Sequence, residues 1–260
     1  MSTAVKAHRT SASSVLRRSS RIEAEVSSLS PLPTWKRVVD VALCILALPV
    51  LAVCTLIMTM ITRLTSPGPV LFRQERVGFK GQRFVCFKFR TMKVSADTGV
   101  HQAHLSELMR SNKPMVKMDS TRDKRLIPGA WLLRASGLDE LPQIINVLKG
   151  EMSLVGPRPC LPYEANEYLP WQRERFNAAP GLTGLWQVSG KNRTTFEEMI
   201  RLDIRYTQEK ALGLDLWIIS MTIPALVIQV LDTRRGRKSA PIVVQVEAHA
   251  VAITTTSTAS

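Results

Sequence analysis

The sequence VALCILALPVLAVCTLIMTMI at residues 41–61 sets the class of this protein, because it contains no charged side chain. A helix needs about 20 such residues to cross the hydrocarbon core of a bilayer, so the segment is just long enough. Pro49 lies near its middle, where proline removes a backbone hydrogen bond and bends a helix. Both flanks are basic, which favours the cytoplasmic side for each end. Two topologies stay open: a kinked spanning helix, and a re-entrant helix–break–helix with both ends on one side.

Outward from this segment, we expect the chain to divide into four parts. Residues 1–33 are rich in Ser, Ala and Arg, which predicts a disordered basic tail. Residues 34–65 contain the apolar helix, with Thr34 suited to cap its start. Residues 66–232 form the main folded domain. Residues 233–260, rich in Thr, Ser and Ala, predict a second disordered tail.

A second apolar run covers residues 212–231, at the end of the main domain. It contains Asp215 and Pro224, and basic residues follow it. A charge and a proline make a full crossing less favourable, so this run predicts a pair of helices lying in the membrane interface.

The overall charge indicates an acidic partner. The formal net charge is +14 and the isoelectric point is about 10.2, which suits nucleic acid, anionic lipid or a phosphorylated substrate. The charge is spread over the whole chain and no nucleic-acid-binding module is recognisable, which argues against nucleic acid. The four cysteines show no CxxC spacing, so a disulfide framework or zinc site is not expected, in keeping with a reducing cytosolic setting. No cleavable secretory signal is visible.

Two segments after the first apolar run predict a β-hairpin. Residues 70–74 and 82–90 have the composition of strands, and glycines lie between them. Lys88 and Arg90 flank Phe89 on the second strand. Two interpretations remain open: solvated bases at a sheet edge, or bases that face a phosphate.

Two adjacent carboxylates, Asp139 and Glu140, follow a helix break at Ser136-Gly137. A helix is expected before them at residues 130–134. A second is expected at residues 140–148, where apolar residues recur at i, i+3, i+4 and i+7. The pair would thus lie at a helix N-terminus, where the helix dipole stabilises an anion. The residues alone fit capping carboxylates and a catalytic pair equally well.

The downstream region combines rigid turns with bases. Pro157-Arg158-Pro159 fixes the backbone around one arginine, which then loses little entropy on binding a phosphate. Residues 163–177 predict an amphipathic helix, and residues 195–210 another. The glycine-rich, basic segment at residues 179–193 is typical of a nucleotide-binding loop.

Six motifs appear in an order that resembles a known family. They are Lys36-Arg37-Val38-Val39-Asp40, Ser66-Pro67-Gly68-Pro69-Val70, Phe87-Lys88-Phe89-Arg90-Thr91-Met92, Leu138-Asp139-Glu140-Leu141-Pro142-Gln143, Val155-Gly156-Pro157-Arg158-Pro159 and Pro180-Gly181-Leu182-Thr183-Gly184-Leu185-Trp186-Gln187. Together they resemble the monotopic phosphoglycosyl transferases, bacterial sugar transferases that start exopolysaccharide and O-antigen repeat units. The resemblance covers about residues 34–232.

The resemblance implies an enzyme that transfers a hexose-1-phosphate from a UDP-sugar to undecaprenyl phosphate and releases UMP. It implies that Asp139 is the nucleophile, through an aspartyl-phosphosugar intermediate, and that Glu140 helps to hold Mg²⁺. Phosphoryl transfer needs cations around the transferred group, which agrees with these roles. The expected phosphate-binding residues are Lys88, Arg90, Arg134 and Arg158, with Lys191 and Arg193 as weaker candidates.

The resemblance also favours the re-entrant topology, with the break at Pro49 and both ends cytosolic. The expected fold class is α+β, mainly helical: a monotopic membrane protein with an N-terminal re-entrant helix–break–helix, a small β-hairpin, a cytosolic catalytic core and interfacial amphipathic helices. It implies the bacterial inner (cytoplasmic) membrane, with anionic lipid as a further partner. A binding protein without catalysis and a catalytically silent scaffold are the competing hypotheses. The sugar transferred and a homodimeric state are left open.

Overall fold

The computed structural model describes residues 32–93, 99–111, 113–115 and 125–235, and the chain divides into two units, residues 1–33 and 34–260. The predicted disordered tails lie almost wholly outside the described residues. The second unit is mainly helical, as expected, with two small two-stranded sheets. Its elements are α2 (Thr34–Thr65), β1 (Leu71–Val77), η1 (Phe79–Gly81), β2 (Arg83–Phe89), α3 (Gly99–Arg110), α4 (Ala130–Ser136), η2 (Leu138–Gln143), α5 (Ile144–Lys149), β3 (Ser153–Val155), α6 (Pro162–Glu167), η3 (Pro170–Asn177), β4 (Gly181–Thr183), α7 (Leu185–Val188), η4 (Lys191–Arg193), α8 (Phe196–Glu209) and α9 (Leu212–Arg235).

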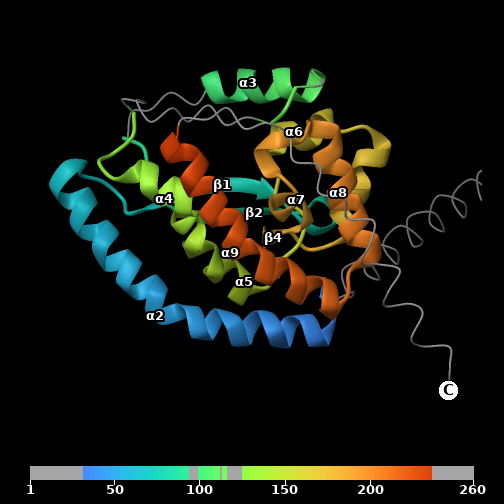
Figure 1. Ribbon diagram of the computed structural model, residues 1–260, viewed down its shortest axis with the longest axis horizontal. Helices are drawn as coiled ribbons and strands as arrows, with labels where there is room; N and C mark the ends of the chain where they lie inside the picture. Colours follow the sequence, from blue (N-terminus) through green and yellow to red (C-terminus); the bar gives the residue numbers. More distant parts are fainter. Residues whose placement is uncertain (1–31, 94–98, 112, 116–124, 236–260) are drawn as a thin grey trace, which may run out of the picture. The chain divides into compact units, whose positions relative to one another are not determined.

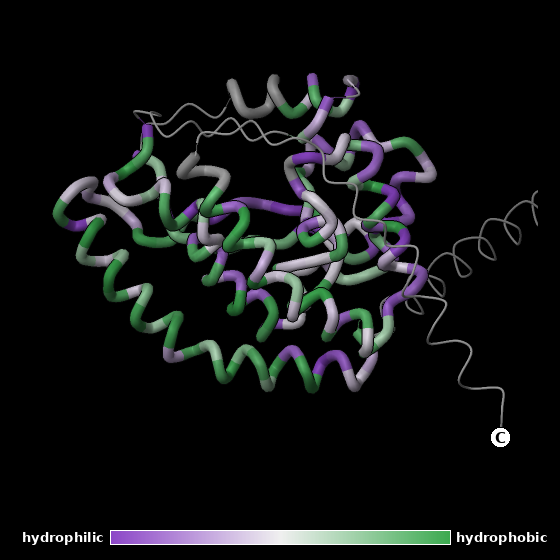
Figure 2. Tube along the Cα trace, in the orientation of Figure 1, coloured by the Kyte–Doolittle hydropathy of each residue, from purple (hydrophilic) through white to green (hydrophobic). Residues whose placement is uncertain are grey.

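The first apolar run forms one helix, α2, which continues through Pro49. Figure 1 shows that α2 bends near its middle, as expected where a proline removes a backbone hydrogen bond. The predicted helix–break–helix is therefore a single bent helix. Many of its large apolar side chains are exposed, and Figure 2 shows the apolar character along its length. Among them are Ile45, Leu46, Val53, Leu56, Met60 and Leu64.

The N-terminal end of α2 is fixed to the folded domain by polar contacts. Lys36 is buried and forms an ion pair with Asp215 at the start of α9. Arg37 donates to the carbonyls of Val147 and Leu148 at the end of α5, where the helix dipole favours a cation. These contacts explain why charged residues precede the apolar run.

The C-terminal end of α2 contacts the same domain. Met58 is buried in a cluster with Phe89 of β2 and Ala130 of α4. Beyond the helix, Arg90 is buried and binds the carbonyl of Ser66, and its Nε donates to the carbonyl of Pro69 at 2.8 Å. The Ser-Pro-Gly-Pro turn after α2 is therefore held by the residue that follows β2.

The second apolar run also forms one helix, α9, which passes through Pro224. The predicted pair of helices is wrong, because α9 packs along α4 and α7 and these contacts support it on either side of the proline (Figure 1). Gln229 of α9 donates to the carbonyls of Arg134 and Ala135, at 3.2 and 2.9 Å. Both α2 and α9 are long and apolar enough to cross a membrane by length and composition.

The predicted hairpin is confirmed. β1 and β2 pair antiparallel from Leu71 opposite Phe89 to Val77 opposite Arg83, and η1 forms the connection. The second sheet, in which β3 and β4 run parallel, is absent from the sequence-based expectations. It forms because the glycine-rich segment lies against the backbone of Gly156, where a Cβ on Gly181 would meet the Gly156 nitrogen at 2.1 Å.

Two predicted helices are each divided in the structure. The helix expected at residues 140–148 is a 3₁₀ helix, η2, followed by α5. The helix expected at residues 163–177 is α6 followed by η3, and Pro170 begins the second piece because it cannot donate within a continuing helix. The helix expected at residues 195–210 is confirmed as α8, which Thr195 caps through its side chain.

Candidate active site

The acidic pair lies in the first turn of η2. Gly137 joins α4 to η2 in the left-handed conformation, with φ of 73°, which glycine adopts without strain. The chain therefore turns sharply just before Asp139 and Glu140, and both residues are half-buried. The predicted position at a helix N-terminus is confirmed, although the helix is of the 3₁₀ type.

Glu140 is held between two side chains. The Lys88 ammonium lies 3.2 Å from Glu140 Oε1, and the buried Gln143 amide donates to Glu140 Oε2 at 3.2 Å. The side chain of Lys88 is 22% exposed and that of Glu140 is 36% exposed, so the pair is open to solvent on one side. The structure thus brings together two of the residues that the sequence indicated, from segments about 50 positions apart.

Asn146, which the sequence analysis missed, holds β2 against this site. Its side chain is buried, donates to the Val85 carbonyl at 2.6 Å, and accepts from the Phe87 amide at 3.1 Å. The Asn146 side chain therefore makes two hydrogen bonds to the backbone of β2 of the kind that a neighbouring strand would make. These bonds fix the position of Lys88 opposite Glu140. An asparagine within a short apolar helix was the only sequence signal for this role.

The other predicted bases lie in three different settings. Arg134 donates to the Thr91 hydroxyl at 3.3 Å, which places it beside the end of β2. Arg90 is buried against Ser66 and Pro69, so it supports the turn after α2, and the interpretation as a solvated base is wrong. Lys191 and Arg193 lie in η4, which packs against α7.

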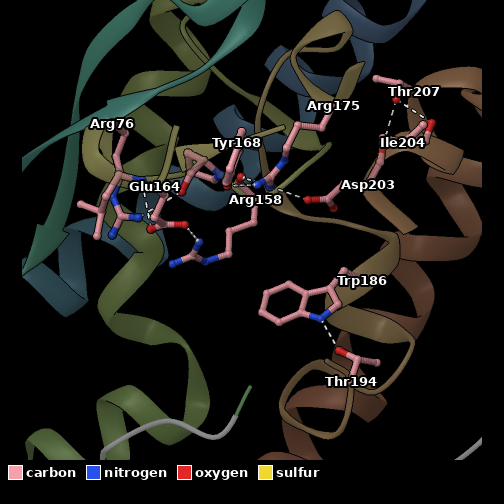
Figure 3. Close-up of polar contacts among 12 residues, drawn as sticks. Arg76, Arg158, Glu164, Tyr168, Arg175, Trp186, Thr194, Asp203, Ile204 and Thr207 are labelled. Carbon is pink, nitrogen blue, oxygen red and sulfur yellow. Dashed lines mark hydrogen bonds and ion pairs between the residues drawn. The ribbon is translucent and has the colours of Figure 1, made fainter. Parts of the chain in front are cut away.

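Arg158 joins a buried cluster of charged residues, drawn in Figure 3. Its guanidinium donates to Glu164 at 3.1 Å, and Glu164 is fully buried. Arg175 is also buried, pairs with Asp203, and donates to the Tyr168 hydroxyl at 2.5 Å. Arg76, the third arginine, donates to the Pro159 carbonyl at 3.0 Å. The sequence showed Arg158 but none of its partners, which come from β1, α6, η3 and α8.

The two carboxylates of this cluster respond to burial differently. Burial alone would raise the pKa of Glu164, but Arg158 and Arg76 hold it below its ordinary value. Burial raises the pKa of Asp203 to about 6, against the lowering effect of Arg175. Both carboxyl groups are therefore ionised at pH 7, and the cluster stays charged.

The glycines of the predicted nucleotide-binding loop have a packing role. A Cβ on Gly184 would lie 2.1 Å from the Gly156 carbonyl oxygen, as close as the one on Gly181 would lie to the Gly156 nitrogen. Trp186 in the same segment is buried, and its indole donates to Thr194 at 2.6 Å. Gly181 and Gly184 are accounted for by their close backbone contact with Gly156, the residue after β3.

The acidic pair fits Mg²⁺ better than a metal that needs many protein ligands. Among the described residues, no group of three or more His, Cys, Asp and Glu side chains could hold a metal ion. Mg²⁺ is usually bound by one or two carboxylates together with substrate oxygens and water. Glu140 offers a hard oxygen ligand on a partly exposed turn, next in sequence to Asp139. This donor set matches what Mg²⁺ requires when a phosphorylated substrate supplies the rest.

Comparison with known proteins covers most of the chain. The family model described as bacterial sugar transferase matches residues 32–229. The exopolysaccharide production protein ExoY of Sinorhizobium fredii is 37% identical over 196 residues, which cover 74% of this chain and 84% of that protein. The UDP-glucose:undecaprenyl-phosphate glucose-1-phosphate transferase of Caulobacter vibrioides is 38% identical over 199 residues, 74% of this chain and 69% of the relative.

A third relative is longer. The undecaprenyl-phosphate galactose phosphotransferase of Salmonella typhimurium is 37% identical over 161 residues, which cover 60% of this chain and 33% of that protein. The matched family region includes α2, the hairpin, the acidic pair and the Arg158 turn, and thus every element of the site described above. The chain belongs to the bacterial sugar transferase family.

Proposed function

We propose that this protein transfers a hexose-1-phosphate from a UDP-sugar to undecaprenyl phosphate and releases UMP, as the first membrane step of exopolysaccharide or O-antigen repeat-unit synthesis. The names of two relatives state sugar-phosphate transfer to undecaprenyl phosphate. The observation that carries the proposal is the Asp139-Glu140 pair, which lies on a partly exposed turn with the Lys88 ammonium 3.2 Å from Glu140. A carboxylate nucleophile beside a cation is what phosphoryl transfer from a diphosphate requires.

Asp139 is the nucleophile in this proposal. Its carboxylate oxygen attacks the phosphorus that carries the sugar, and the bond from that phosphorus to the UMP oxygen breaks. This leaves the sugar phosphate bonded to Asp139 and UMP as the leaving group. A phosphate oxygen of undecaprenyl phosphate then attacks the same phosphorus and restores the free carboxylate. Each step exchanges one phosphorus–oxygen bond for another, so no oxidant or reductant is needed.

The cationic groups around the pair neutralise the diphosphate in this proposal. Lys88, from β2, lies beside Glu140, and Arg134 lies beside the end of the same strand. Arg158 is assigned to phosphate oxygens because its side chain is partly exposed and its backbone is fixed. Mg²⁺, held by Glu140 and diphosphate oxygens, would stabilise the charge of the leaving UMP. Lys191 and Arg193 stay weaker candidates, and Arg90 has a supporting role.

The attachment of α2 at both ends supports a re-entrant disposition. A 32-residue helix is about 48 Å long, which exceeds the hydrocarbon thickness of about 30 Å. A straight crossing would place its two ends on opposite sides of the membrane. The buried Lys36 near one end and Thr62 near the other instead pack within one folded domain. Both ends then stay on the cytosolic face of the inner membrane, where UDP-sugars are available, and the exposed apolar side chains enter the lipid.

UMP release by the purified full-length protein in detergent micelles tests the proposal. Undecaprenyl phosphate and Mg²⁺ are supplied with a panel of UDP-sugars, and the wild type is compared with Asp139→Asn. Glu197→Gln is the control, because Glu197 is exposed and its side chain forms an ion pair with Arg201 on the surface of α8, away from the acidic pair in the chain. We expect UMP from one sugar, lost in Asp139→Asn and retained in the control.

The same preparation tests the covalent step. Without undecaprenyl phosphate, the wild type should release a stoichiometric burst of UMP and then stop, whereas Asp139→Asn should show no burst. Turnover at the wild-type rate by Asp139→Asn would remove Asp139 as nucleophile. Absence of UMP with every UDP-sugar would reject the proposed reaction.

A further inference from the structure

We propose that Glu164 is a positioning residue that aims the guanidinium of Arg158 at the substrate diphosphate. This inference rests on the proposed function, which assigns Arg158 to phosphate oxygens. It concerns how a fully buried carboxylate sets the orientation of a partly exposed arginine.

The backbone of the Pro157-Arg158-Pro159 turn is fixed from within the protein. Arg175 donates to the Arg158 carbonyl at 2.6 Å, and Arg76 donates to the Pro159 carbonyl at 3.0 Å. Both of these arginines are buried. Two consecutive carbonyls of the turn therefore accept from charged donors, which form stronger hydrogen bonds than neutral donors do. The turn is held in place before any ligand binds.

The side chain of Arg158 is held by a different contact. Glu164 Oε2 accepts from Arg158 Nη1 at 3.1 Å, while Glu164 Oε1 accepts from the Leu161 amide at 3.0 Å. The second bond ties the carboxylate to the first turn of α6, so the carboxylate cannot follow the guanidinium if the guanidinium rotates. Figure 3 shows Glu164 between Arg76 and Arg158.

Glu164 and Arg158 differ in how far their side chains are exposed to solvent, and this difference distinguishes their roles. The side chain of Glu164 is 0% exposed, and that of Arg158 is 22% exposed. A purely structural pair would have both groups enclosed, as Arg175 and Asp203 are at 1% each. Here the carboxylate is enclosed, whereas the Arg158 side chain reaches solvent over part of its surface.

The charge of the cluster points to an anionic ligand at that position. Three arginines, Arg76, Arg158 and Arg175, share two carboxylates, Glu164 and Asp203, which leaves an excess of one positive charge. Arg158 pairs with Glu164 and Arg175 pairs with Asp203, so the excess belongs to the cluster as a whole, and Arg158 is the member of the five whose side chain is substantially exposed. A buried excess of charge is costly, and an anion bound at the exposed edge would offset it.

Steady-state kinetics of Glu164→Gln test the positioning role in the purified full-length protein. The amide keeps the size of the side chain and an acceptor for the Leu161 amide, but it removes the negative charge that orients Arg158. At saturating undecaprenyl phosphate, we expect the KM for the UDP-sugar to rise about tenfold with kcat changed less than about twofold, as when uniform substrate binding is lost. Glu197→Gln, the matched exposed control, should leave both constants unchanged.

Two further arms separate positioning from loss of structure. Arg158→Gln should raise the same KM, and the double variant with Glu164→Gln should be no worse than Arg158→Gln alone. If Glu164→Gln folds poorly, Glu164→Asp takes its place. This variant keeps the buried charge but withdraws the oxygen by one methylene, so it should also raise the KM for the UDP-sugar. The proposal would be overturned if the fold increases in KM of the two single variants multiplied in the double variant. An unchanged KM in both Glu164 variants would also overturn it.

Binding of UDP separates this inference from the proposed function. UDP carries the diphosphate without the sugar, and its binding needs no turnover. We expect UDP to raise the unfolding temperature of the wild type, and to raise that of Glu164→Gln by less at the same concentration. A reduced shift in an enzyme that releases no UMP would retain the positioning role and reject the reaction. Equal shifts in both proteins, or no shift in the wild type, would overturn the positioning role.

Discussion

Lys36 and Asp215 form a buried ion pair across 179 positions of sequence, and the Tyr206 hydroxyl contacts both of them. The pair joins the first turn of α2 to the first turn of α9, so it fixes the starts of the two apolar helices to each other. The same contact explains the acidic residue inside the second apolar run. A charge that is unfavourable in a lipid-exposed helix is satisfied here by a lysine at the base of the other helix.

Removing one partner of this pair should strongly destabilise the protein. Lys36→Met leaves Asp215 buried without its cation, so the free energy of unfolding should fall by about 3–5 kcal/mol. The measurement is chemical unfolding in detergent micelles. The double variant Lys36→Met/Asp215→Leu should recover most of the loss, because no uncompensated charge remains. A single variant as stable as the wild type would contradict the structural role of the pair.

Gly181→Ala should disrupt the β3–β4 contact. The new Cβ would meet the Gly156 nitrogen at 2.1 Å and the Thr183 carbonyl oxygen at 2.3 Å, both of them backbone atoms that cannot move aside independently. The loss of stability should reach or exceed the usual overpacking range of about 1–3 kcal/mol. Gly213→Ala in α9 is the matched control, since its Cβ would meet nothing within 4 Å and alanine favours a helix by up to about 1 kcal/mol. Equal stability of the two variants, measured by thermal unfolding, would rule out the contact.

Turnover should require Mg²⁺. Excess EDTA should abolish UMP release, and added Mg²⁺ should restore it, because the proposed mechanism relies on an ion held by Glu140 to neutralise the diphosphate. Glu140→Gln should need a higher Mg²⁺ concentration for half-maximal rate than the wild type does. Glu197→Gln should show the wild-type requirement. Full activity in EDTA would remove the metal from the mechanism.

The stability contributed by Glu164 should disappear at acid pH. Its pKa in the folded protein is held below the ordinary value of 4.5, so the unfolded state binds more protons between the two pKa values. The contribution is therefore fully present above about pH 4.5 and is lost as pH falls through the folded pKa. The difference in unfolding free energy between the wild type and Glu164→Gln should shrink over this window. Asp203, with its pKa raised to about 6, has the opposite dependence and is present in both proteins.

Local patterns predicted the elements that depend on nearby residues. The apolar runs, the hairpin, the position of Asp139 and Glu140, and the helix at residues 195–210 all follow from spacing or from one turn of chain. The resemblance of six ordered motifs predicted the family, which the comparison confirms.

Features that depend on distant residues could not be predicted. Nothing in the sequence around Arg90 distinguishes a phosphate ligand from a residue that holds the Ser66 carbonyl, because the outcome depends on how α2 returns to the sheet. The glycines near Gly181 have the composition of a nucleotide loop, whereas their contact with Gly156 lies outside any local pattern. Asn146 likewise satisfies a strand about 60 positions away, and no periodicity signals it.

The attachment of α2 at both ends has a consequence for biogenesis. On the re-entrant topology proposed above, no charged side chain of the described chain has to be translocated, since Lys36 and Arg90 stay with the same folded domain. The helix can enter the lipid from the side on which the ribosome releases it. Insertion then depends on exposed apolar side chains such as those of α2, and purified protein mixed with preformed vesicles should acquire its membrane-bound state without a translocation channel.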